Sequence, residues 1–399
     1  MAYTVPVVAY AAANDFEGTY TALTGIQSVH ISRGRRRFQD QFTQTTCAVE
    51  LIPADSYTLP LEVGQWIDVR VLPISTDRAW FTGRISDVQR DYDFPYDTVS
   101  GAAPADRITI TAVGAMGAIG QSGNAIMIGA STDDARENMV NLMAGIDVYM
   151  DEYISVSGST DKWNKFGVST TIAAGTGQSN LDLMNWLANA GQAFIDDVDL
   201  FRLDVSGQNF MVNAYNTSDR EIVFSDNPGV GEYKFNGITY LSGALDTFNE
   251  VTVSGYDTSL TKQSVNSGAG APYNELQYQT QLNSTGQMLS LAGYLVTTQN
   301  ETDPTPIVVR TNTLIADGIQ AECYMSQNTV ADWFNQLIGA AETVEFRGTT
   351  VTGIVQGASM AFYPEHANFE FYLSPFLGAA FTLDSTVLGV LDTNRLGYP

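Results

Sequence analysis

Five short segments between residues 26 and 113 alternate apolar and polar residues, and this alternation restricts the fold more than any other feature of the chain. Successive side chains of a strand point to opposite faces, so a period of two predicts strands with one buried face. β-branched residues dominate the segments, and proline or glycine lies between them, as is usual for strands joined by turns. The segments are Ile26–Ser32, Thr46–Leu51, Gln65–Val71, Trp80–Val88 and Arg107–Val113. They predict a small antiparallel β-barrel or sandwich over residues 26–115.

The apolar period then changes and indicates helices. Ser131 and Thr132 are candidate caps for a first helix. Ser179 and Asp182 form a capping-box pattern ahead of a second apolar stripe. A hairpin should follow, formed by Phe194–Leu203 and Phe210–Ala214. Residues 116–220 are therefore predicted to be an α+β insert.

The second half of the chain indicates a further β domain. Residues 221–256 should return as strands to the first barrel, and residues 257–274 are rich in Ser, Gly and Ala, which predicts a linker. Residues 275–399 are predicted to form a second barrel-like domain with an amphipathic helix that begins at Asn328. Its strand-like runs are Thr343–Phe346, Thr350–Gln356 and Ala367–Leu373. Residues 1–25 show no clear period and are predicted to be an N-terminal arm, with an extra edge strand as the alternative.

Two short pieces of these strands are alike. Thr352-Gly353-Ile354-Val355 echoes Thr82-Gly83-Arg84-Ile85, and each lies in a strand followed by a loop and a closing strand. The echo is too short to count as a repeat, but two related barrels in one chain would leave such a trace. The predicted fold class is mainly β (α+β overall), with two small antiparallel β-barrel or sandwich domains and the α+β insert between them.

The chain is strongly acidic, with 19 Lys and Arg against 44 Asp and Glu and a formal net charge of -25. The first 120 residues hold nine basic and thirteen acidic residues, so most of the excess lies in the remainder. Such a chain should not bind nucleic acid through its phosphates, which needs clustered Lys and Arg. The acidic surface either serves solubility or adaptation to salty water, or lines a passage in which DNA slides without sticking. Solubility is the preferred reading unless the fold places the acids on a lumen.

No catalytic, cofactor-binding or metal-binding residues are predicted. His30 and His366 are the only histidines, and neither has a recognisable nucleophile motif nearby. These histidines and the two cysteines, Cys47 and Cys323, lack the spacings typical of zinc sites. Acidic pairs are so abundant that they single out neither a glycosidase nor a calcium site. We therefore expect a protein that is not an enzyme and needs no cofactor.

Cysteine usage and hydropathy bear on the compartment. Cys47 and Cys323 are expected to be buried free thiols in a protein that folds in a reducing cytoplasm, with a disulfide between them as the alternative. The N-terminus lacks the basic region and long apolar core of a signal peptide. No run of about 18 uncharged apolar residues occurs, so no insertion into a membrane is expected.

One basic cluster stands out in this acidic chain, directly after the first predicted strand. It consists of Arg33, Arg35, Arg36 and Arg37. The cluster is either a solvated turn or an interface, because four arginines beside acidic neighbouring subunits would favour assembly and fix orientation. We name it as a candidate interface and leave both readings open.

The order of these segments resembles the tail hub proteins of long-tailed bacteriophages, a group that includes baseplate hub and minor tail proteins. In the first barrel the likeness covers the turn Arg33–Arg35, Leu51, Val63-Gly64, Ile67–Val71 and Phe81–Val88. At the end of the chain it covers Phe371–Pro375, Phe381–Gly389 and Leu391–Leu396. No single motif is strongly specific, and the order of the motifs carries the resemblance.

The resemblance implies a structural protein of the virion at the distal tip of the tail, made in the host cytoplasm. Three copies would form a homotrimeric ring of six barrels that closes the tail tube and opens for DNA release. The implied partners are the distal tail protein, a tail fibre or central tip protein, and the tape-measure protein. DNA would pass the lumen without specific binding.

The alternative is a carbohydrate-binding or carbohydrate-degrading β protein of the tail tip. An aromatic content of 11%, with 19 Tyr, suits stacking on sugar rings. A hub needs a large self-association surface, whereas a sugar-binding or hydrolytic protein needs an aromatic groove with paired carboxylates.

Overall fold

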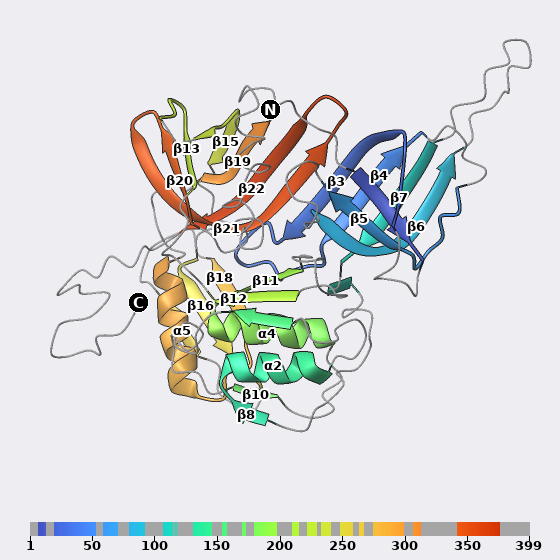
Figure 1. Ribbon diagram of the computed structural model, residues 1–399. Helices are drawn as coiled ribbons and strands as arrows, with labels where there is room; N and C mark the ends of the chain where they lie inside the picture. The colour runs from blue at the N-terminus through green and yellow to red at the C-terminus, as the bar shows by residue number, and fades with distance from the viewer. Residues whose placement is uncertain are drawn as a thin grey trace, which may run out of the picture.

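The computed structural model describes residues 7–12, 20–52, 59–70, 80–91, 107–114, 116–117, 131–145, 154–157, 170–172, 179–197, 210–214, 222–229, 233–240, 248–257, 263–266, 274–298, 306–312 and 341–375. Two β units lie side by side above an α+β unit (Figure 1). The predicted fold class is confirmed, because large antiparallel sheets dominate and helices are few.

The first β unit extends from residue 7 to residue 113. Its strands are β1 (Val7–Ala11), β2 (Thr21–Ala22), β3 (Ile26–Gly34), β4 (Thr46–Leu51), β5 (Trp66–Arg70), β6 (Phe81–Asp91) and β7 (Arg107–Val113). They follow one another in the sheet as β3-β4-β7-β6-β5-β1-β2, and every neighbouring pair is antiparallel. The alternation seen in the sequence selects the buried face, because Cys47, Val49 and Leu51 of β4 point inward and their neighbours are only partly covered.

The second β unit comprises two stretches of the chain, 222–240 and 306–375. Its strands are β13 (Ile222–Ser225), β14 (Tyr233–Lys234), β15 (Gly237–Tyr240), β19 (Pro306–Asn312), β20 (Ala341–Phe346), β21 (Thr349–Phe362) and β22 (Ala367–Pro375). Arg347 and Gly348 link β20 to β21 with φ of 51° and 79°. Two successive positive φ values give the two-residue turn whose twist matches that of the flanking strands, and the glycine adopts its value without strain.

This arrangement differs from the domain order expected for residues 221–256. Strand β13 pairs with β14 and β20, and β15 pairs with β19, so these strands belong to the second β unit and do not return to the first barrel. Within 257–274, Gln263–Asn266 forms strand β17, which pairs with β16 (Glu250–Ser254). The local alternation in these segments fixes which face is buried but carries no information about which sheet supplies the partner.

The α+β unit lies below both β units (Figure 1). Its helices are α2 (Ala135–Gly145), α4 (Asn180–Gly191) and α5 (Thr285–Thr298). Its remaining strands are β8 (Ser131–Asp133), β9 (Ile154–Ser157), β10 (Thr170–Ile172), β11 (Ala193–Asp197), β12 (Phe210–Ala214) and β18 (Glu275–Gln279). Residues 248–298 thus add a helix and a three-stranded sheet to the insert, whereas the sequence pattern assigned residues from 275 onward to the second barrel.

The structure shows which residues cap helices α4 and α2, for both of which the sequence predicted capping residues. Ser179 caps α4 as expected, because its Oγ accepts a hydrogen bond from the Asp182 backbone N–H at 3.1 Å. For α2, the residue that accepts from the Glu137 backbone N–H is Asp134, at 2.8 Å, since Ser131 and Thr132 belong to strand β8. The helix predicted to begin at Asn328 lies outside the described residues.

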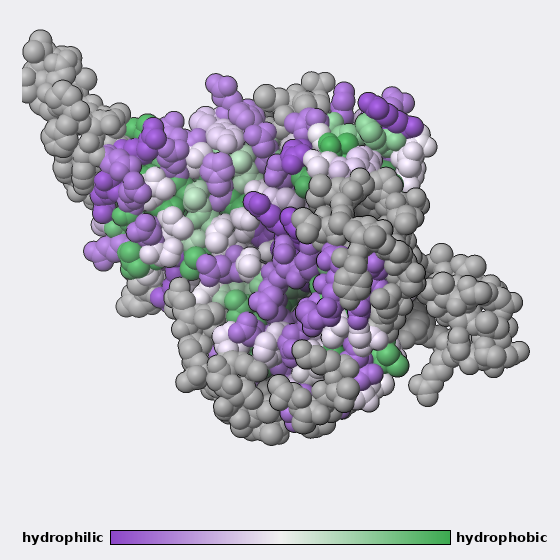
Figure 2. Space-filling model, turned by 180° about the vertical axis from the view of Figure 1, so that it is seen from behind, coloured by the Kyte–Doolittle hydropathy of each residue, from purple (hydrophilic) through white to green (hydrophobic). Residues whose placement is uncertain are grey.

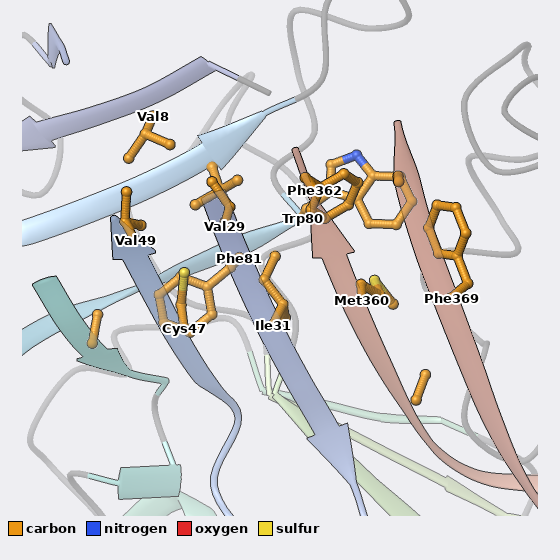
Figure 3. Close-up of a cluster of buried hydrophobic side chains, with 14 of the residues drawn as sticks. Val8, Val29, Ile31, Cys47, Val49, Trp80, Phe81, Met360, Phe362 and Phe369 are labelled. Atoms are coloured by element: carbon orange, nitrogen blue, oxygen red, sulfur yellow. The ribbon is translucent and has the colours of Figure 1, made fainter. Parts of the chain in front are cut away.

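Two apolar cores hold the molecule together. One core is common to both β units, and Figure 3 shows Val29 and Ile31 of the first unit in one cluster with Met360 and Phe362 of the second. The Trp80 and Phe362 rings meet edge to face with centroids 5.2 Å apart. The other core fills the α+β unit with side chains from its helices and from β16 and β18. Burying apolar surface in common makes the two β units one packed layer.

Candidate functional site: the junction of the two β units

The two β units repeat one strand order. Across the second unit the order is β15-β19-β22-β21-β20-β13-β14, which matches β3-β4-β7-β6-β5-β1-β2 strand for strand along the chain. One difference is the direction of the first strand: β13 runs parallel to β20 and β14, whereas β1 runs antiparallel to β5 and β2. The strands of the two units share little sequence, so their equivalence is hard to recognise from the sequence alone. The four-residue echo was the one sign of it in the sequence analysis.

The echo lies in equivalent strands and in equivalent register. Thr82–Ile85 belongs to β6, and Thr352–Val355 belongs to β21. Arg84 is opposite Trp66, as Ile354 is opposite Ala341, so the strand before each echo is aligned identically. One residue after each echo is bulged, Ser86 in β6 and Gln356 in β21. A bulge at the same place in both strands extends the likeness beyond the four residues.

Strand β3 of the first unit pairs with β21 of the second, and this pairing is the junction of the two units. It extends from Gly34 opposite Gly357 to Val29 opposite Phe362. Gly357 is there because the backbone of β3 lies close to it. A Cβ at position 357 would collide with the carbonyl oxygen of Arg35 and come within 2.6 Å of that of Arg33.

Arg35 links the two β units at the junction through both its backbone and its side chain. Its backbone N–H donates to the Gln356 carbonyl at 3.0 Å, and its side-chain Nε donates to Gln356 Oε1 at 2.7 Å. Gln356 in turn donates from Nε2 to Ser374 Oγ at 2.7 Å. The guanidinium also lies 4.2 Å from the centre of the Phe42 ring and 5.0 Å from that of Phe38. The bulged residue of β21 is thus held by a buried arginine of the first unit.

The same turn contacts the α+β unit. Phe42 donates its backbone N–H to Asn185 Oδ1 at 2.8 Å, and Asn185 Nδ2 returns a hydrogen bond to the Phe42 carbonyl at 3.2 Å. The Phe38 ring stacks on that of Tyr278 with centroids 5.8 Å apart. The Tyr278 hydroxyl donates to Asn189 Oδ1 at 2.9 Å. Residues 35–42 therefore connect all three units, from β21 to helix α4 and strand β18.

Burial changes the ionisation of both central groups. Desolvation lowers the pKa of Arg35 to about 10, opposed by Tyr278 and Asp40, so the guanidinium is charged at neutral pH. Desolvation also raises the pKa of Tyr278 above its usual value, and the neighbouring Arg35 works against that rise. Hydrogen bonds and aromatic faces offset the cost of burying this charge.

The structure separates the four arginines of the basic cluster. Arg33 and Arg35 are buried, with 2% and 6% of their surface exposed. Arg36 and Arg37 are exposed, and the Arg36 guanidinium lies 5.6 Å from the centre of the Tyr372 ring. Two of the four arginines are thus buried and two are exposed. The first two are buried because β21 pairs with the end of β3, directly before the exposed pair. The interface prediction stays a prediction, and Arg36 and Arg37 are the members that a neighbouring chain can reach.

The two histidines, far apart in sequence, meet at one tyrosine. The Tyr363 ring stacks on His366 at 4.8 Å and meets His30 edge to face at 5.7 Å, next to the pairing of His30 with Ala361. Within the described ranges no three metal-ligating side chains gather. Cys47 is buried and free, and burial raises its pKa; Cys323 lies outside the described residues. No helix in the described part of the chain is long and apolar enough to cross a membrane.

Comparison with known proteins supports the arrangement. No family model and no curated protein matches the chain. The 43 kDa tail protein of prophage MuSo2 from Shewanella oneidensis is a similar solved structure, with a TM-score of 0.61 and 10% identity over 93% of this chain and 98% of that one. A tail protein from Neisseria meningitidis has a TM-score of 0.58 and 10% identity over 93% of this chain and 97% of that one. The resemblance inferred from the order of the segments is confirmed at the level of fold: this chain has the fold of phage tail proteins.

Proposed function

We propose that this chain is a structural component of a phage tail, located at the distal tip, where three copies form a hub ring. The observation that carries the proposal is the repeated strand order of the two β units, in a chain with the fold of phage tail proteins along nearly its whole length. Three chains with two equivalent units each supply six units, which suits the six-fold symmetry of a tail tube.

In this proposal the chain performs no chemistry. The ring closes the tail tube and opens for DNA release, and its acidic residues leave passing DNA unbound because like charges repel. Its neighbours are the distal tail protein, a tail fibre or central tip protein, and the tape-measure protein. Arg36 and Arg37, exposed beside the junction, are proposed contacts with an acidic neighbour.

Electron microscopy of intact particles labelled with a gold-conjugated antibody against this chain tests the proposal. Label confined to the far end of the tail is the expected result. Label along the fibres would instead favour a carbohydrate-binding protein, and particles without label would contradict a place in the virion. Turnover of cell-wall polysaccharide that one Asp→Asn change abolishes would contradict the absence of chemistry.

A further inference from the structure

The α+β unit has an apolar core of its own, and few side chains of the two β units reach into it. Of the described residues buried in this core, all belong to the α+β unit except Phe42, Met116 and Ile354. Phe38, partly buried, packs against the same core. Phe38 and Phe42 come from one turn, residues 35–42, between strands β3 and β4. This turn therefore supplies much of the apolar contact between two otherwise separate cores.

The polar contacts of the turn point in two directions. Arg35 holds the bulged residue Gln356 of β21 through its backbone N–H and its Nε. Phe42 holds Asn185 of helix α4 through two hydrogen bonds to its backbone. Within the turn, the Arg35 guanidinium lies against the rings of Phe38 and Phe42. The bulge of β21 and helix α4 are thus connected through one turn.

Docking of the α+β unit keeps a charge buried. The side-chain hydrogen bonds of Arg35 go to neutral acceptors, the Gln356 amide oxygen and the Asp40 backbone carbonyl. The Asp40 carboxylate is exposed and accepts from the backbone N–H of Arg37. A buried charge without a buried carboxylate partner is unfavourable, and desolvation lowers the pKa of Arg35 accordingly. Return of this guanidinium to water would offset part of the contacts that the unit loses when it moves away.

We propose that the turn 35–42 is a clamp with two states. In the closed state, which the structure shows, the α+β unit is docked on the β units. In the open state both cores stay folded and the unit tilts away, still tethered by the chain at 114–130, 215–221, 241–249 and 299–305. Because the turn also holds the bulge of β21, loosening the bulge should open the clamp. Two sites without mutual contact are then coupled through one two-state element.

Distance measurement between two spin labels by pulsed electron paramagnetic resonance tests the clamp in the full-length chain. One label is attached at Thr349→Cys, exposed at the start of β21, and the other at Ser290→Cys, exposed on helix α5. Cys323→Ser removes one native thiol, and buried Cys47 stays unlabelled. The closed state should give one narrow distance distribution, and the open state should add a second, broader component.

The first variant acts on the side of helix α4. Asn185→Ala removes both hydrogen bonds to the Phe42 backbone, so the open population should rise about tenfold or more. Asn138→Ala is the matched control, because Asn138 is also buried but bonds to Thr170 within the α+β unit. It should leave the distance distribution unchanged. Equal increases in both variants would overturn the clamp, since the stability of the unit and not the turn would then govern docking.

The second variant acts on the opposite side of the turn. Gln356→Ala removes the side-chain acceptor of Arg35 and should also raise the open population, although Gln356 bonds only to residues of the β units. Val344→Ala, in the core of the second β unit, is the control for a general loss of stability and should not open the clamp. A distribution unchanged by Gln356→Ala would overturn the proposed coupling, whatever Asn185→Ala does.

A further readout uses the surface that opening exposes. Figure 2 shows a mostly hydrophilic surface from behind, and the exposed large apolar side chains of the described residues are Val63 and Leu289. Opening would add the rings of Phe38 and Phe42. Binding of an apolar fluorescent dye should therefore rise together with the second distance component in Asn185→Ala. A second component without added dye binding would overturn the open state.

Hydrogen exchange separates opening from unfolding. Backbone amides of β4 and α4, one strand and one helix from the two cores, should stay protected in every variant that opens. A second distance component that appears only with loss of this protection would overturn the proposal. The inference concerns the chain by itself and does not rest on the proposed function. A chain that stays closed in every variant would overturn the clamp and leave the hub standing, whereas absence of label from the tail would do the reverse.

Discussion

Strands β6 and β21 are equivalent in position, register and bulge, yet their surroundings differ. The bulged residue of β21, Gln356, is 1% exposed and bonded to Arg35, whereas its counterpart Ser86 is exposed and donates to the Thr111 carbonyl at 3.1 Å. The residue that follows is Gly357 in one strand and Asp87 in the other. The two strands thus share their backbone pairing because the units share one topology. The residues at the bulge differ because β21 is covered there by Arg35 and β3, whereas β6 is exposed. The comparison gives four predictions.

The largest effect is expected from Gly357→Ala. The added Cβ meets the backbone of Arg33 and Arg35, which cannot move without opening the β3–β21 pairing, so unfolding free energy should fall by about 3 kcal/mol. Urea unfolding measures it. The matched change Asp87→Ala, on the exposed counterpart, should alter stability by about 0.5 kcal/mol or less. Equal losses at both positions would show that the junction does not depend on this close approach.

The next effect concerns the bulged residues themselves. Gln356→Ala removes the partners of the Arg35 Nε–H and the Ser374 hydroxyl in a buried place, and a loss of about 2–3 kcal/mol is expected. Ser86→Ala, its counterpart, should cost about 0.5 kcal/mol or less because water replaces the exposed hydrogen bond. Chemical denaturation of both variants measures the two losses of unfolding free energy. Their difference shows how much stability comes from the buried partners of Gln356; equal losses would mean that these partners contribute nothing.

A third prediction uses pH on the α+β side of the junction. Burial raises the pKa of Tyr278, so this phenol ionises at about pH 10 in the unfolded chain and only at a higher pH in the folded chain. Its stabilisation is complete below that pH and is lost as the pH rises towards the folded value. Above pH 10 the unfolding free energy should therefore fall more steeply with rising pH in the wild-type chain than in Tyr278→Phe; the lowered pKa of Arg35 acts in the opposite direction in both chains. A core change without a titrating group, Phe224→Leu, should keep the wild-type slope, and a Tyr278→Phe slope equal to it would refute the assignment.

The smallest effect separates the members of the basic cluster. Arg37 is exposed, so Arg37→Ala should change the stability of the isolated chain by about 0.5 kcal/mol or less. If Arg37 contacts an acidic neighbour, the same change should weaken assembly more strongly at low salt than at high salt. A marked loss of stability in the isolated chain would show that Arg37, like Arg35, belongs to the internal junction.

Most strands of the first β unit and the start of helix α4 could be predicted from the sequence, whereas the partners of the later strands could not. Alternation located strands β3 to β7 of the first β unit, and Ser179 with Asp182 marked the start of α4, because both signals lie within a few residues of the chain. Strands β1 and β2 lie in residues 1–25, where the sequence predicts an arm because the strands are short and show no clear period. The partner of β13 and the burial of Arg35 depend on residues more than a hundred positions away. An arginine next to exposed arginines carries no local sign that a strand will cover it.

The sequence by itself determined the β class of this protein, the faces that its strands bury, its acidity and the short echo between residues 82–85 and 352–355. Only the tertiary structure decided that the echo marks two units of one strand order, and that Arg35 and Gln356 join them. The reason is physical: side-chain alternation and capping are local properties, whereas strand partners are chosen by burial against segments far away in the chain.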